Sequence, residues 1–130
     1  MKTLLILAAN PRDTTPLRLD EEVREIDGVL RRAQRRDDFE IKQQWAVRSR
    51  DVQAAMLDFN PHIVHFSGHG EGVQGLAFED GKGKVHLVNA DALAGLFKLF
   101  AKQVECLILN ACYSEVQAEA IAQHINGRLL

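Results

Sequence analysis

The sequence has few cysteines, prolines and aromatic residues. Its 130 residues include two cysteines and three prolines, and aromatic side chains make up 6% of the chain. Two cysteines are too few for a disulfide framework, so a reducing, cytoplasmic location is the expectation. No apolar run approaches the roughly 18 residues that a membrane-spanning helix requires, so we expect no membrane partner.

The sequence also has no excess of one charge. Sixteen Lys and Arg residues stand against eighteen Asp and Glu residues, which gives a net charge of −2. Proteins that bind nucleic acids usually carry a basic excess or stripe, so a nucleic-acid partner is not expected. The composition, 46% hydrophobic and 26% charged, is that of a globular protein, and the length predicts a single domain over residues 1–130.

Apolar segments alternate with amphipathic ones along the chain. Segments typical of buried strands lie at residues 3–9, 39–47, 63–66 and 104–109. A helix of about five turns has Thr15 and Pro16 as its N-cap and first-turn residues and carries its apolar face over residues 19–33. Further helices are predicted at 51–59, from Asn89 or Asp91 to Phe100, and from Ser114 onward. This alternation predicts an α/β fold in which helices cover both faces of a mostly parallel sheet.

One short hairpin interrupts the alternation. Residues 76–78 and 85–88 are apolar and flank the polar segment 79–84. Asp80 and Gly81 within that segment are typical of a tight turn, and Gly81 is expected to supply a positive φ angle.

The strand at 104–109 is expected to lie at an edge of the sheet, where pairing with a second copy of the chain would produce a homodimer.

The loops that follow parallel strands meet at one edge of a sheet, where ligands bind. His69 follows the third strand and Cys112 follows the fourth, so neighbouring strands would bring the two residues together. An imidazole beside a thiol raises the thiolate fraction and produces a nucleophile with its base. The N–H groups of Gly70 and Cys112 would then form an oxyanion hole. The alternative is that His69 and Cys112 are ordinary loop residues without a catalytic role. Cys106 differs from both, because it lies within a predicted strand and is expected to be a small buried hydrophobe.

Two other kinds of site are less well supported. Residues 70–75 match the pattern G-x-G-x-x-G, but they lead into a hairpin where a dinucleotide site requires a helix. His62, His65 and His69 suggest a metal site, but positions 62 and 65 of a strand point to opposite faces. We therefore expect neither a metal nor an organic cofactor.

Several motifs in order resemble one family. Residues 63–70 (IVHFSGHG) and 109–115 (LNACYSE) look like the paired His and Cys motifs of the CHAT domain. Residues 9–11, 17–22 and 78–80 resemble further parts of that family. CHAT domains are caspase- and separase-like bacterial domains, often found beside TPR repeats.

The resemblance implies a caspase-like three-layer sandwich and a cysteine endopeptidase that acts on peptides or proteins. It makes His69 the catalytic histidine and Cys112 the nucleophile, with Gly70 and Cys112 as the oxyanion hole. Asn110, two residues before the nucleophile, would line the pocket for the residue that precedes the cut. Asp13, on the first loop, is a candidate for a charge in that pocket.

The chain departs from the family pattern after the Cys motif. CHAT domains usually continue with at least another strand and helices, whereas this sequence stops at Leu130. The expectation is therefore a truncated domain whose C-terminal part is missing. The alternatives to a peptidase are a catalytically inactive interaction module of a bacterial signalling or defence system, and a gene fragment. A TPR protein or another sensor protein is the implied partner.

Overall fold

A mostly parallel sheet is the centre of the molecule. The computed structural model describes residues 2–11, 18–33, 36–45, 47–71, 74–111, 119–120 and 128–129. Within these ranges the strands of the main sheet lie in the order β2-β1-β3-β6-β7, and all their pairings are parallel. Their bounds are β1 (Lys2–Ala8), β2 (Phe39–Gln44), β3 (Ile63–Ser67), β6 (Cys106–Asn110) and β7 (Arg128–Leu129).

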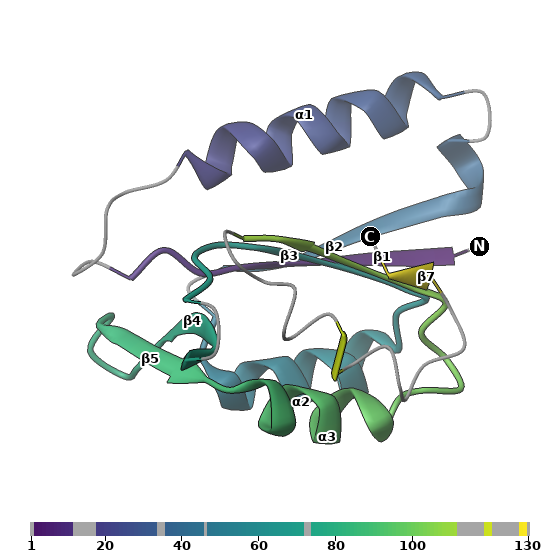
Figure 1. Cartoon of the computed structure of the whole chain (residues 1–130). Helices are drawn as coiled ribbons and strands as arrows, with labels where there is room; N and C mark the ends of the chain where they lie inside the picture. Colours follow the sequence, from purple (N-terminus) through teal and green to yellow (C-terminus); the bar gives the residue numbers. More distant parts are fainter. Residues whose placement is uncertain are drawn as a thin grey trace.

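Helices cover both faces of this sheet, which confirms the predicted α/β class and is consistent with a caspase-like fold. Helix α1 (Leu19–Arg32) lies over one face, and α2 (Ser49–Phe59) and α3 (Ala90–Lys98) lie under the other (Figure 1). A short 3-10 turn, η1 (Arg36–Asp38), precedes β2. The two faces are called the α1 face and the α2/α3 face below.

Alternating side chains of the strands form a separate apolar cluster on each face. The larger cluster lies on the α2/α3 face and joins strand residues to both helices: Leu5, Leu7, Val64, Phe66, Leu107, Val52, Met56, Leu93 and Phe97. The smaller cluster packs β1 against α1 and has Leu4, Ile6 and Val23 as its buried members. Burial of the α2/α3 face therefore supplies most of the hydrophobic stabilisation of the described fold.

The ends of several elements differ from the predictions. Helix α1 begins at Leu19 with Arg18 at its N-cap, and its 14 residues make roughly four turns, one fewer than predicted. The predicted caps Thr15 and Pro16 lie outside the described residues, as does most of the helix predicted from Ser114.

Two strands and one helix are also shorter than predicted. Strand β2 ends at Gln44, and β6 begins at Cys106. Helix α3 begins after Asn89, whose side chain accepts from Ala92 N–H at 2.9 Å, and it ends at Lys98. Phe100 was predicted to be helical, but its N–H bonds to Phe97 O, three residues back, so the backbone tightens into turns there.

The predicted hairpin is present, but its turn differs in one angle. Strands β4 (Leu76–Glu79) and β5 (Val85–Val88) pair antiparallel. The positive φ angle belongs to Gly83, at 79°, and not to Gly81. Gly83 N–H bonds to Asp80 O at 3.1 Å, and the Asp80 carboxylate accepts from Lys82 and Lys84 N–H. These bonds close a turn over residues 80–83, and Gly83, which has the positive φ angle, is the last residue of that turn.

Strand β6 is not a bare edge of the sheet, contrary to the prediction. Its first two residues, Cys106 and Leu107, pair with Arg128 and Leu129 of β7. Beyond Leu107, none of the described strands flanks β6 on that side. The sequence predicts a buried Cys106, but this residue is only partly buried at the start of β6. No helix within the described ranges is long and apolar enough to cross a membrane.

Candidate functional site

The loops after β3 and β6 begin side by side. Ser67, the last residue of β3, is paired with Asn110, the last residue of β6, and Gly68 N–H donates to Asn110 O at 3.3 Å. This register confirms that the third and fourth predicted strands are neighbours. His69 therefore lies two residues beyond the paired strand ends. Cys112 and Asp13 lie outside the described residues, so the pairing of His69 with Cys112 stays a prediction.

Backbone contacts hold the loop that carries His69. Ala9 N–H donates to Ser67 O at 3.1 Å, and Ala77 N–H donates to His69 O at 2.9 Å. Gly68 is required for close packing, since a Cβ atom there would lie 2.9 Å from Ala9 O and 3.0 Å from a ring carbon of Phe66. The His69 side chain is half-buried, so the loop is positioned while its imidazole stays accessible.

The backbone of Gly70 pairs with the hairpin without using its own N–H group. Gly70 and Leu76 form an isolated antiparallel bridge. Its hydrogen bonds run between the flanking residues, from Glu71 N–H to Gly75 O and from Ala77 N–H to His69 O, both at 2.9 Å. In such a pair the N–H of the central residue points away from the partner strand. The N–H of Gly70 thus points away from β4, although Gly70 itself is buried.

A polar cluster that the sequence did not predict lies on the α1 face of the same edge. Glu22, on the first turn of α1, has its Oε1 atom 3.1 Å from His65 Nε2, and it also accepts a hydrogen bond from Asn110 Nδ2. His65 and Glu22 are largely buried, with side-chain exposures of 11% and 25%. The three residues come from three different elements, which is why no local pattern revealed the cluster.

Ser67 adds a buried hydroxyl to this region. Its side chain is fully buried, and its Oγ atom has no hydrogen-bond partner in the part of the chain that the structure describes. Alternation along β3 puts Ser67 on the same face as His65, and its pairing puts it beside Asn110. A buried polar atom without a partner is uncommon in a stable fold and is a mark of functional sites.

Two carboxylates accept hydrogen bonds from residues that follow strands β1 and β2. Glu79 of β4 accepts from Asn10 N–H at 3.1 Å, which ties the start of the first loop to the hairpin. Asp51 of α2 accepts from the backbone N–H and the guanidinium of Arg48, at 3.0 and 3.1 Å. Burial alone would raise the pKa of Asp51, but the hydrogen bonds and the charge of Arg48 outweigh it, so the pKa is lowered.

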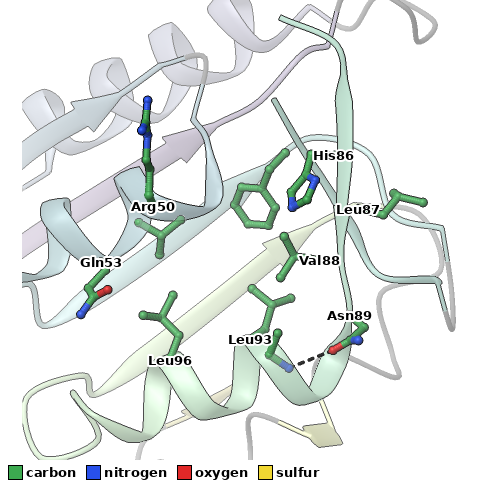
Figure 2. Close-up of a pocket in the computed structure, with 11 residues that line it drawn as sticks. Arg50, Gln53, His86, Leu87, Val88, Asn89, Leu93 and Leu96 are labelled. Carbon is green, nitrogen blue, oxygen red and sulfur yellow. Dashed lines mark hydrogen bonds between the residues drawn. The ribbon is translucent and has the colours of Figure 1, made fainter. Parts of the chain in front are cut away.

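A separate cavity of about 440 Å³ lies between α2, the hairpin and α3. Figure 2 shows His86 and Val88 on one side of β5 and Leu87 pointing the opposite way. The other labelled lining residues come from α2 and from the start and body of α3, with Asn89 at the N-cap. The predicted site residues that the structure describes, His69, Gly70 and Asn110, do not line this cavity, so it is distinct from the edge that carries them.

Comparisons with known proteins agree with this architecture. The sequence model of the CHAT domain matches residues 2–127. A protein of Gillisia limnaea named "Probable protease" is 25% identical over 126 residues, which are 95% of this chain and 22% of that protein. The chain thus spans about a fifth of the length of the relative.

Proposed function

The chain belongs to the CHAT domain family, a peptidase family, and from this premise we propose that it is a cysteine endopeptidase whose nucleophile is Cys112 and whose base is His69. The observation that carries the proposal is the pairing of Ser67 with Asn110. Because of this pairing, the loop that carries His69 and the segment that leads to Cys112 begin at neighbouring points of one sheet edge. His69 and Cys112 each lie two positions beyond that pair, which is at most about 7 Å of extended chain.

The chemistry follows from these positions. His69 takes the proton of the Cys112 thiol, and the thiolate attacks the carbonyl carbon of the peptide bond. The N–H groups of Gly70 and Cys112 stabilise the oxyanion of the tetrahedral intermediate. Its collapse breaks the C–N bond, His69 gives the proton to the leaving amine, and a thioester remains. Water then hydrolyses the thioester with His69 as base, which releases the acid product and restores the thiol.

The remaining parts of the proposal concern what surrounds this centre. Asn110 forms a wall of the pocket for the residue that precedes the cut. The reaction needs no metal and no organic cofactor, because thiolate, imidazole and N–H groups supply every step. A peptide or protein is the substrate, a TPR or other sensor protein is the regulator, and the cytoplasm is the site of action.

Selective alkylation tests the dyad directly. The chain is treated with iodoacetamide at mildly acid pH, where a thiol with the usual pKa of about 8.5 is almost entirely protonated, and intact mass counts the labels. We expect fast addition of a single label, which is lost in Cys112→Ala and at least tenfold slower in His69→Ala. Cys106→Ala is the matched control, because it removes the other thiol and should leave the fast label unchanged.

A slow alkylation whose rate is unchanged in His69→Ala would overturn the peptidase proposal. That outcome would favour the inactive interaction module, which keeps the motif without its chemistry. Fast labelling that persists in Cys112→Ala and disappears in Cys106→Ala would assign the reactive thiol to β6 and would reject Cys112 as the nucleophile.

A further inference from the structure

We infer that Glu22 and Asn110, beside the buried Ser67, line the pocket for the side chain that precedes the cut, and that this pocket selects Arg or Lys. The inference rests on the proposed function, because it assigns the substrate class of the same site. Asn110 by itself is neutral and selects no charge. The side chain that supplies a negative charge is Glu22, which the structure brings to Asn110 from 88 residues away in the sequence.

Glu22 has no Lys or Arg partner among the described residues. Its ionic contact there is His65, which is charged only when protonated, at 3.1 Å. The neighbouring Glu21 differs, because its carboxylate is 56% exposed and lies 3.7 Å from the guanidinium of Arg18. A cationic ligand would give this largely buried carboxylate a permanently charged partner, which His65 supplies only when it is protonated.

The neighbouring groups are hydrogen-bond acceptors as well. The Ser67 hydroxyl is buried without a partner and can accept or donate. The amide nitrogen of Asn110 donates to Glu22, and the amide oxygen of the same side chain is a further hydrogen-bond acceptor. An arginine guanidinium has five N–H donors and no acceptor, and an ammonium has three donors. A carboxylate with two neutral oxygens beside it matches those groups.

The location suits the residue that precedes the cut. Asn110 is two residues before the proposed nucleophile, within about 7 Å of it along an extended chain. The carbonyl that Cys112 would attack belongs to the residue whose side chain enters this pocket. An acidic side chain there would be repelled by the Glu22 charge, and an apolar one would give Glu22 no charged partner. Both would be disfavoured relative to Arg or Lys.

A binding experiment separates this inference from the dyad. N-acetyl-arginine amide and its neutral isostere N-acetyl-citrulline amide are titrated into the Cys112→Ala chain, and amide NMR shifts report affinity. We expect arginine to bind about tenfold more tightly than citrulline, as a charge-assisted hydrogen bond implies. Glu22→Gln keeps the acceptor oxygen and removes the charge, so it should abolish the preference. Glu21→Gln is the matched control and should retain it.

Equal binding of the two amides, or binding of neither, would overturn the inference, and so would a preference that survives Glu22→Gln. If Glu22→Gln fails to fold, as judged by circular dichroism, the comparison of the two amides in the Cys112→Ala chain still decides. Because that chain lacks the thiol, a dead dyad would appear only in the alkylation experiment. An active dyad without arginine preference would reject this pocket and leave the proposed function standing.

Discussion

The two faces of the sheet use the same strands for different purposes. On the α2/α3 face, Val64 and Phe66 of β3 are buried in the larger apolar cluster. On the α1 face, the alternate residues of β3 change from apolar Ile63 to His65 and then Ser67 toward the carboxyl edge. One face is thus apolar along its length, while the other becomes polar where the site lies.

The coverage of the two faces differs in the same sense. Two helices pack on the α2/α3 face, but α1 leaves a shallow apolar recess of about 580 Å³, lined in part by Val29, Ile63 and Ile108. Val29 is 63% exposed at its border. Stability is therefore concentrated on the α2/α3 face, and the α1 face is free to carry polar groups.

Phe66→Ala should produce the largest loss of stability. Phe66 is 2% exposed and its ring centroid lies 5.2 Å from that of Phe78. Truncation leaves a cavity in the larger cluster and should lower the free energy of unfolding by about 3–5 kcal/mol. Urea denaturation followed by circular dichroism measures this. A loss below 1 kcal/mol would show that the α2/α3 face is not the main source of stability.

Gly68→Ala should have the next largest effect. The added Cβ would lie 2.9 Å from the backbone oxygen of Ala9, which cannot move without shifting β1. We expect a loss of about 1–3 kcal/mol from overpacking and slower alkylation of Cys112, because the shift displaces the His69 loop. The same denaturation and alkylation measurements apply. Unchanged stability would mean that the two loops do not pack as closely as the structure has them.

Ser67→Ala should act in the opposite direction to Phe66→Ala, although the two residues are adjacent and both are buried. It removes a hydroxyl that has no partner in the described part of the chain, so stability should stay equal or rise by about 1 kcal/mol. Arginine amide should bind more weakly to this variant. A marked loss of stability would show that the hydroxyl is structural and not kept for a ligand.

Asp51→Asn should have the smallest effect, and the effect should depend on pH. The pKa of Asp51 is lowered from 3.8, because the hydrogen bonds and charge of Arg48 outweigh burial. A lowered pKa stabilises the fold above 3.8 and loses that contribution as pH falls through the lower, folded-state value. The stability difference between parent and variant, below about 1 kcal/mol at pH 7, should therefore vanish in acid. A difference that does not shrink as pH falls below 3.8 would contradict this.

Helices, strands and caps that are specified by neighbouring residues could be predicted from the sequence. The apolar runs of β1 and β3, the hairpin strands and the Asn89 cap were all predicted from neighbouring residues. The ends of α1, β2 and α3 were not, because these ends depend on where the helix or strand leaves its tertiary neighbours. The Gly83 angle was missed because hydrogen bonds to Asp80 decided the form of the turn.

The class of fold, the family and the identity of the candidate dyad follow from the amino-acid sequence. Periodicity and short motifs are properties of neighbouring residues, so they can be read without a structure. The pairing of Ser67 with Asn110, and the contacts of Glu22 with His65 and Asn110, are known only from the folded chain. Strand register and helix placement join residues that are 43 and 88 positions apart, and no local pattern encodes such contacts.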